Sequence, residues 1–221
     1  MGSIVPSARV DYLVLVNREH PVPDGWEKNL ETVHVTNSLG EDVEVEKKAY
    51  EAWQRLRLDL EENDGIRLEL DSGLRSISAQ QDIMDRFMVK YGAEYTLNTV
   101  APPGFSEHHT GLAMDLYFRV LGQDGNDTDV CENEAMIEYS EIWKKIHAKL
   151  AAYGFILRYP EGCESITGYG YEPWHIRYLD NPEIAKEIMD RGITLEEYFA
   201  DPLPNRVLPS QSPDTKGEGT I

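Results

Sequence analysis

The sequence is poor in cysteine, which limits the kinds of scaffold and metal site that it can form. Only two cysteines occur among its 221 residues, Cys131 and Cys163, and they lie far apart with no Cys-x-x-Cys pair. Such usage disfavours a disulfide framework and a cysteine-based structural zinc site. We interpret both residues as reduced thiols, with a single bridge between them as the alternative.

Basic residues and long apolar runs are also scarce. The chain has 21 Lys and Arg against 40 Asp and Glu, which gives a net charge of −19. Because this field repels phosphate backbones, we exclude nucleic acid as a partner. No apolar run approaches the roughly 20 residues that cross a bilayer, so no transmembrane segment is predicted.

The N-terminus lacks the features of an export signal. Residues 1–9 contain no basic segment followed by an apolar segment and a small-residue cleavage site. We therefore expect the chain as given to be cytoplasmic. If the natural protein carries a leader ahead of these residues, we expect it to be extracellular or associated with the cell wall.

The order of predicted elements favours an α+β fold with a mostly antiparallel sheet flanked by helices. Alternating apolar residues predict strands at 10–17, 31–35, 43–45, 66–71, 112–120, 155–159 and 174–179. Apolar residues at helical spacing predict helices at 46–62, 79–91 (with Ser78 as N-cap), 135–153, 182–191 and 195–200. Residues 122–129 are predicted to form a polar loop. Residues 1–200 are expected to form one domain, and 201–221, rich in Pro, Ser, Gly and Thr, a flexible tail.

Two segments carry residues with specific chemistry. Residues 106–115 read Ser-Glu-His-His-Thr-Gly-Leu-Ala-Met-Asp, and residues 172–178 read Glu-Pro-Trp-His-Ile-Arg-Tyr. Two imidazoles with one carboxylate form a ligand set of catalytic zinc, which leaves a fourth position for water. An additional glutamate can take a proton from that water. The sequence contains no His-Glu-x-x-His, so the site is not the helical zinc site of that motif.

Asp115 is the strongest single candidate for a metal ligand. A carboxylate in the middle of a predicted strand is costly unless it is paired, capped by backbone amides or bound to a metal. Unbroken alternation would place His109 on the same face as Asp115, whereas a bend at Gly111 would favour His108. The residues alone leave both histidines open.

Glu172 is the candidate for the additional carboxylate. Pro173 follows it directly and favours extended backbone at the preceding residue, so we expect a turn that leads into the strand at 174–179. From this turn Glu172 can reach an attacking water while His175 reaches the metal. The position suits a general base.

The pattern Ser-x-His-x-x-Gly-x-Ala-x-Asp followed by Glu-x-x-Trp-His resembles the VanY-type D-alanyl-D-alanine carboxypeptidases. That group also includes LD-carboxypeptidases and bifunctional dipeptidase/carboxypeptidases of cell-wall metabolism. Further similar segments are 72–76 (Ser-Gly-Leu-Arg-Ser) with Gln80, 101–104 (Ala-Pro-Pro-Gly), and 153–160. The resemblance covers about residues 10–180. It implies an α+β fold shared with lysostaphin-type peptidases and the hedgehog signalling domain.

The resemblance also implies roles for individual residues. It makes His108, Asp115 and His175 the ligands of Zn²⁺ and Glu172 the catalytic base, which decides between the two histidines. Arg75 is implied to polarise the scissile carbonyl or to hold a substrate carboxylate. The remaining implied substrate contacts are Ser106 and Gln80.

The implied function is removal of the terminal D-Ala from peptidoglycan stem peptides or their precursors by a zinc-dependent D-alanyl-D-alanine carboxypeptidase. One alternative is an LD-carboxypeptidase that acts on tetrapeptide stems. The other is a catalytically silent, zinc-containing module that binds the cell wall. The oligomeric state is not predicted.

Overall fold

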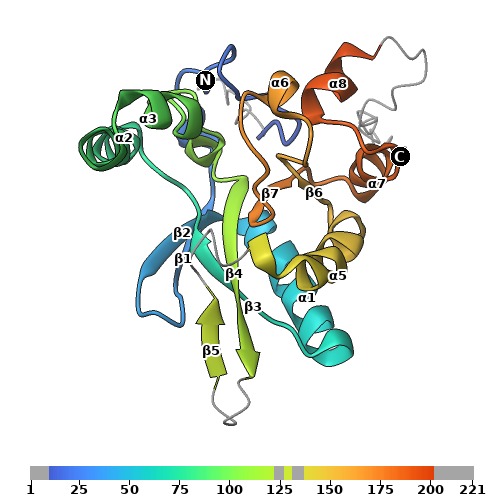
Figure 1. The fold of residues 1–221 in the computed structure, drawn as a ribbon. Helices are drawn as coiled ribbons and strands as arrows, with labels where there is room; N and C mark the ends of the chain where they lie inside the picture. The colour runs from blue at the N-terminus through green and yellow to red at the C-terminus, as the bar shows by residue number, and fades with distance from the viewer. Residues whose placement is uncertain (1–9, 122–126, 131–136, 202–221) are drawn as a thin grey trace, which may run out of the picture.

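The computed structural model describes residues 10–121, 127–130 and 137–201. Its centre is an antiparallel sheet in the order β3-β4-β7-β6, with β5 paired to β4 (Figure 1). A separate hairpin pairs β1 with β2. The strands are β1 (Thr32–Thr36), β2 (Asp42–Glu46), β3 (Arg67–Ser72), β4 (Ala113–Leu121), β5 (Asp127–Val130), β6 (Phe155–Leu157) and β7 (His175–Tyr178).

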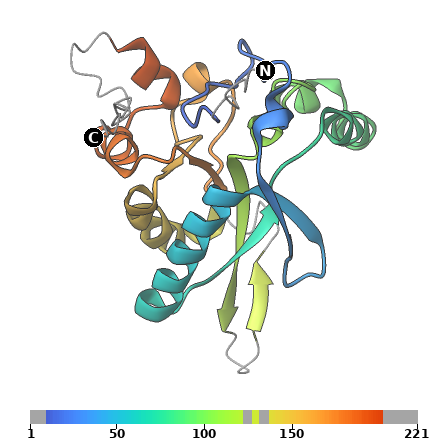
Figure 2. The same ribbon diagram turned by 180° about the vertical axis from the view of Figure 1, so that it is seen from behind.

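Helices surround this sheet, which confirms the predicted α+β class. Figure 1 shows α2 and α3 on one side of the upper end of β4, with α6, α7 and α8 on the other. Figure 2, the view from behind, shows α1 and the β1–β2 hairpin on the side of the sheet that faces away from the viewer in Figure 1. The α-helices are α1 (Lys47–Asp64), α2 (Ile77–Tyr91), α3 (Ala93–Thr99), α5 (Ser140–Leu150), α6 (Glu164–Thr167), α7 (Pro182–Arg191) and α8 (Leu195–Ala200). The 3-10 helices are Trp26–Asn29, Glu107–Thr110 and Ala151–Tyr153.

Two apolar clusters hold these layers together. The larger one lies between α1, α5 and the sheet, with Leu56 of α1, Leu68 of β3 and Trp143 of α5 all buried. The smaller one fixes α7 and α8 against β6 through residues such as Ile156 and Leu195. Each fully buried aliphatic side chain contributes roughly 1.5–3 kcal/mol, so these clusters set the position of the strands that carry the site.

Local signals explain the helix ends. The Asn181 side chain accepts hydrogen bonds from the first turn of α7, Pro182 occupies its first position, and Gly192 ends it with a left-handed φ of 62°. Thr194 and Glu197 form a capping box at α8. The predicted bounds of both helices are confirmed.

The prediction of a strand at residues 10–17 is wrong. The side chains do alternate, but Val14 packs against the larger cluster and Leu13 against the smaller one. The carbonyls of Tyr12 and Val14 accept hydrogen bonds from the Arg177 side chain. The alternation therefore reflects a segment between two apolar clusters and not a strand.

Other element bounds also differ from the predictions. The N-cap of α2 is Ser76 and not Ser78, because the Ser76 hydroxyl accepts the Ala79 amide. The predicted helix at 135–153 is interrupted at Tyr139 and ends in a 3-10 turn, while 135–136 lie outside the described residues. Of the predicted loop 122–129, residues 127–129 belong to β5 and 122–126 are not described. The predictions missed α3 and α6.

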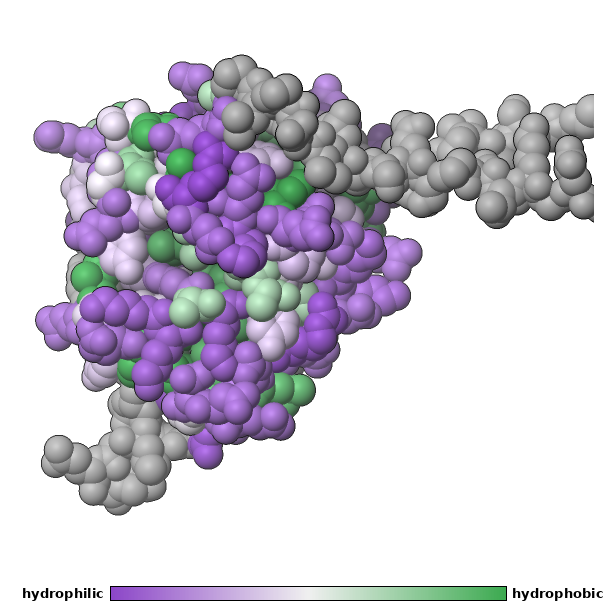
Figure 3. Space-filling view, turned by 90° about the vertical axis from the view of Figure 1, so that its right-hand side faces the viewer, coloured by the Kyte–Doolittle hydropathy of each residue, from purple (hydrophilic) through white to green (hydrophobic). Residues whose placement is uncertain are grey.

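Two predictions concern residues that the structure does not describe. The flexible tail falls on 202–221, and a bridge would require Cys131, so both stay predictions. In the described part of the chain, no helix is both long and apolar enough to cross a membrane. Figure 3 shows that the face seen from the right of Figure 1 is mainly hydrophilic, with apolar side chains in small separate patches.

Candidate active site

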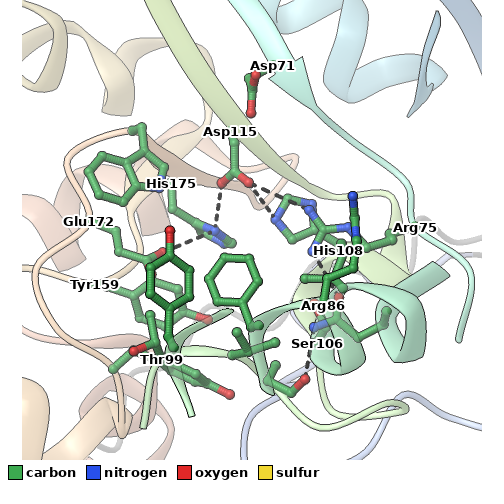
Figure 4. Close-up of a pocket in the computed structure, with 18 of the residues that line it drawn as sticks. Asp71, Arg75, Arg86, Thr99, Ser106, His108, Asp115, Tyr159, Glu172 and His175 are labelled. Atoms are coloured by element: carbon green, nitrogen blue, oxygen red, sulfur yellow. Dashed lines mark hydrogen bonds and ion pairs between the residues drawn. The ribbon is translucent and has the colours of Figure 1, made fainter. Parts of the chain in front are cut away.

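Strand pairing brings together two of the predicted metal ligands. In the antiparallel register of β4 and β7, Asp115 lies directly opposite His175. Asp115 Oδ1 is 3.0 Å from His175 Nδ1, and Asp115 Oδ2 is 3.1 Å from His108 Nε2. Figure 4 shows the Asp115 carboxylate between the two imidazoles. One donor atom from each of the three residues lies within 4.8 Å of the others.

His108 reaches this cluster because the chain bends before β4. It lies in the 3-10 turn Glu107–Thr110, which ends at Gly111 with a left-handed φ of 70°. This bend breaks the alternation of side chains between the two faces, so that His108 and not His109 lies next to Asp115. The resemblance implied the same choice. His109 instead holds the neighbouring loop, since its ring nitrogens bond the Arg75 carbonyl oxygen at 2.7 Å and the Gly104 amide at 3.0 Å.

Hydrogen bonds outside the cluster orient both imidazoles. His108 Nδ1 donates to the Gly73 carbonyl oxygen at 2.7 Å, which leaves Nε2 with a lone pair toward Asp115. His175 Nε2 lies 3.4 Å from the buried Glu107 carboxylate, so the neutral ring that a metal ion requires keeps its proton on Nε2 and its lone pair on Nδ1. Such outer partners fix the tautomer and orientation of metal-binding histidines.

The electrostatics of the cluster fit a bound cation. Burial raises the pKa of Asp115, but His108 and His175 outweigh burial and hold it well below its usual range. Burial lowers the pKa of His175, whereas the Asp115 and Glu107 carboxylates outweigh it and raise the value to about 9. Asp115 Oδ1 is buried and pairs with His175 Nδ1 at 3.0 Å. Two imidazoles compensate a buried carboxylate only when they carry protons or share a cation with it.

Glu172 lies beside the cluster, in the loop between β6 and β7. Its Oε2 is 3.7 Å from His175 Nδ1. Burial raises the pKa of Glu172 and Asp115 adds to the effect; His175 and Arg75 oppose it, and the value reaches about 7. A carboxyl group in this range can both accept and return a proton near neutral pH.

Arg75 approaches the cluster from the turn between β3 and α2. Its Nη2 lies 3.9 Å from Asp115 Oδ2 and donates to Ser72 Oγ at 2.7 Å. Its Nη1 donates to Gln80 Oε1 at 2.9 Å. Gln80 is buried and its amide also donates to the Ala101 carbonyl oxygen. Gln80 therefore holds Arg75 in place, and Ser106 lies buried at the same wall.

A cavity of about 520 Å³ opens over these residues. Figure 4 shows Glu172 and Tyr159 on one side of it and Arg75 and Ser106 on the other. The first side comes from the β6–β7 loop, and the second comes from α2 and the segments around it. The structure thus brings all of the predicted site residues to one cavity.

Comparison with known proteins identifies the family. Residues 42–181 match the family described as "VanY: D-alanyl-D-alanine carboxypeptidase". The chain belongs to the VanY family. This confirms the predicted resemblance, and the segment contains every predicted site residue.

Individual relatives agree with this membership. The chain is 36% identical to the putative carboxypeptidase YodJ of Bacillus subtilis (strain 168), over 85% of its own length and 66% of the relative's. It therefore spans just under two thirds of that protein. A VanY D,D-pentapeptidase mutant solved with Zn(II) has a TM-score of 0.68 at 31% identity, covering 85% of this chain and 98% of that one. The LD-carboxypeptidase LdcB has a TM-score of 0.68 at 34% identity, covering 86% of each.

The sequence predictions missed a buried charge network behind this VanY site. Glu107 Oε1 accepts from Arg158 Nε at 2.7 Å and from Arg177 Nη1 at 2.9 Å, and all three side chains are fully buried. Glu196 forms a two-point pair with Arg158 at 2.9 and 2.6 Å. The local sequence pattern does not predict these ion pairs, because the partners lie 38–70 residues apart in the chain.

Asp71 is a second residue that the predictions missed. It lies at the end of β3 and lines the same cavity. Burial raises its pKa to about 6, with added repulsion from Asp115 and Glu41 and an opposing effect of Arg75. Asp71 and Glu172 are therefore both easier to protonate than ordinary carboxylates.

Proposed function

We propose that this protein is a zinc-dependent carboxypeptidase that releases the terminal D-alanine from peptidoglycan stem peptides or precursors ending in D-Ala-D-Ala. The observation that carries the proposal is the convergence of His108, Asp115 and His175 with Glu172 at the edge of the same cluster. The spare glutamate distinguishes this arrangement from a structural metal site, which has no use for a base.

The three-residue cluster would hold the zinc ion. Its donors are two imidazole nitrogens and a carboxylate oxygen within 4.8 Å of one another, which is a ligand set of catalytic zinc. When bound, zinc supplies a Lewis acid that polarises the scissile carbonyl and lowers the pKa of water.

The residues of the chain carry the proton and position the substrate. Glu172 takes a proton from the attacking water as the water oxygen bonds to the carbonyl carbon. It then gives the proton to the amine nitrogen as the carbon–nitrogen bond breaks, which releases D-alanine. Arg75, fixed by Ser72 and Gln80, donates toward the carbonyl oxygen as that oxygen gains negative charge.

The relatives support this substrate class and also provide a second candidate. The similar VanY structure is that of a D,D-pentapeptidase with Zn(II), which supports both the metal and the D,D specificity. The similar LdcB structure is that of an LD-carboxypeptidase, which favours a tetrapeptide as the alternative substrate. The presence of Glu172 in the cavity argues against a silent binding module.

Product analysis by mass spectrometry tests the proposal. Zinc-loaded protein and a Glu172→Gln variant would be incubated with muramyl pentapeptide and, separately, with muramyl tetrapeptide. We expect the protein to release one alanine from the pentapeptide. The variant should lose about 100-fold or more of this activity, because removal of a general base costs that amount, while its zinc content stays unchanged. Release from the tetrapeptide alone would assign the LD activity, and no release from either would overturn the proposal.

A further inference from the structure

Arg18 lies in the N-terminal segment, ahead of the part of the chain that matches the VanY family. Figures 1 and 2 show this segment passing between α3 and α6. The guanidinium group bonds backbone carbonyl oxygens on both sides: Nη1 donates to Leu97 at 2.8 Å, Nη2 to Asn98 at 3.0 Å and Nε to Gly168 at 3.1 Å. One side chain therefore joins two segments that are far apart in the chain.

The carbonyl groups that Arg18 bonds lie at helix ends. α3 ends at Thr99, and Pro102, which would be the helical partner of the Asn98 carbonyl, has no N–H group to donate. Gly168 is the C-cap of α6, with a left-handed φ of 79°. A Cβ at this glycine would lie 2.8 Å from Arg18 Cδ, so a larger residue would displace the arginine. The two helix ends therefore form a site that one guanidinium group fills.

Both joined segments continue into the lining of the active-site cavity. The chain after α3 lines the cavity from Thr99 to Ala101. The Ala101 carbonyl oxygen accepts from Gln80 at 2.8 Å, and Gln80 in turn accepts from Arg75. On the other segment, Tyr169 directly follows the C-cap of α6 and lines the same cavity. The first segment is thus part of the support of Arg75.

A series of ring contacts runs from Arg18 to the metal cluster. The Arg18 guanidinium carbon lies 4.4 Å from the centre of the Tyr169 ring, a distance typical of a cation–π contact. The Tyr169 and Tyr159 rings are 5.0 Å apart, and the Tyr159 ring is 4.7 Å from the imidazole of His175. The Glu172 amide donates to the Tyr159 carbonyl oxygen at 3.2 Å. Arg18 therefore contacts the same β6–β7 loop that carries Glu172.

We propose that Arg18 is a positioning residue that fixes the segment after α3 against the β6–β7 loop and thereby keeps Arg75 and Glu172 at the separation that the reaction requires. Arg18 is not among the residues that line the cavity, so it acts through the segments it joins and not on the substrate. The inference rests on the proposed function, since it assigns Arg75 and Glu172 to one reaction.

Kinetics on matched variants test this inference. The variants are Arg18→Gln, Arg18→Lys and Arg55→Gln, in which Arg55 is exposed on α1 outside the cavity. Arg55→Gln removes the same unit charge, so it controls for the overall field of the protein. The substrate is an acetylated lysyl-D-Ala-D-Ala. Rates are expressed per bound zinc, so that a fraction of unfolded protein does not count as slower catalysis.

We expect Arg18→Gln to lower kcat per bound zinc by about 10- to 100-fold, because a misplacement of about 1 Å between reacting groups has an effect of this order. KM and zinc affinity should stay near those of the unchanged protein, since Arg18 contacts neither the substrate nor a metal ligand. Arg18→Lys keeps the charge and can bond some of the carbonyl groups, so it should restore part of the loss. Arg55→Gln should behave as the unchanged protein.

Amide hydrogen exchange measured by NMR tests the same contact without relying on activity. The amides of Val100 and Glu172 are hydrogen-bonded on the two segments that Arg18 joins, whereas the Ile66 amide bonds Leu60 at the end of α1. Arg18→Gln should raise the exchange rates of Val100 and Glu172 by about fivefold or more, because the loss of a hydrogen bond has an effect of this order on local stability. The exchange rate of Ile66 should not change.

Three results would count against the inference. If Arg18→Gln keeps the kcat of the unchanged protein, Arg18 does not position the site. If exchange rises at all three amides or at none of them, Arg18 either supports the whole fold or does not join the two segments, and the assignment is wrong. If the unchanged protein releases no alanine, the proposed function fails and the inference fails with it, whereas the first two results leave the proposed function intact.

Discussion

Glu107 offers a direct test of how the site is held together. Replacing it with glutamine keeps the shape of the side chain and removes its charge. The carboxylate bonds Arg158 at 2.7 Å and Arg177 at 2.9 Å, and its other oxygen lies 3.4 Å from His175 Nε2. All three partners donate hydrogen bonds to the carboxylate. The NH₂ group of glutamine is also a donor, so it must face at least one of them without forming a hydrogen bond.

The size of the effect follows from what each arginine retains. Arg158 keeps its two-point pair with Glu196, so its charge stays compensated. Arg177 keeps only the carbonyl oxygens of Tyr12, Val14 and Tyr178, and among the described residues it has no second carboxylate. One buried charge is therefore left unpaired, which costs about 3 kcal/mol, the low end of the range for breaking a buried pair.

Thermal unfolding of the metal-free protein measures this cost. For a chain of this size about 1 kcal/mol shifts Tm by about 2–4 °C, so we expect Glu107→Gln to melt about 6–12 °C lower. Glu62→Gln, on the exposed face of α1, removes the same charge and should leave Tm within about 2 °C. A Glu107→Gln protein that melts as high as Glu62→Gln would refute the reasoning.

The pH dependence gives an independent check with a definite sign. Burial acts to raise the pKa of Glu107, but Arg158 and Arg177 outweigh it and hold this pKa well below its usual range. A carboxyl group with a lowered folded-state pKa stabilises the fold above its unfolded value, which is about 4.3. The stability difference between the original protein and Glu107→Gln should therefore be full at neutral pH and shrink as the pH falls below about 4.

Two further substitutions test the site and its support. Asp115→Asn should weaken zinc binding by more than about 100-fold, beyond the loss typical of an outer partner, and calorimetric titration measures this; equal affinity would remove Asp115 from the ligand set. Gly73→Ala should lower the free energy of unfolding by about 1–3 kcal/mol in urea, because a Cβ would lie 2.2 Å from the Glu44 carbonyl oxygen. Gly170→Ala is its control, since a Cβ there meets nothing within 4 Å; equal effects would contradict the steric argument.

The parts of the fold that sequence predicted are those with local signals. Helical spacing of apolar residues predicted the bounds of α7 and α8 to the residue, and the structure shows local caps at both, Asn181 and Thr194. The motif around His108 and Asp115 predicted the metal-binding residues that the structure brings together. The arginine pairs of Glu107 could not be predicted in this way, because they join residues 51 and 70 positions apart. The error at 10–17 has the same origin, since only the fold shows that two apolar clusters flank that segment.

Contacts made by residues before position 42 show that the structural unit extends beyond the segment that matches the family. The match begins at residue 42, yet the carbonyls of Tyr12 and Val14 hold Arg177, and Arg18 bonds the carbonyl oxygens of Leu97, Asn98 and Gly168. A chain that begins at residue 42 also loses β1, the partner of β2. We expect such a truncated protein to lack a cooperative unfolding transition in calorimetry, because buried Arg177 loses two of its acceptors. A truncated protein that unfolds cooperatively near the original Tm would show that these early residues only cover the surface.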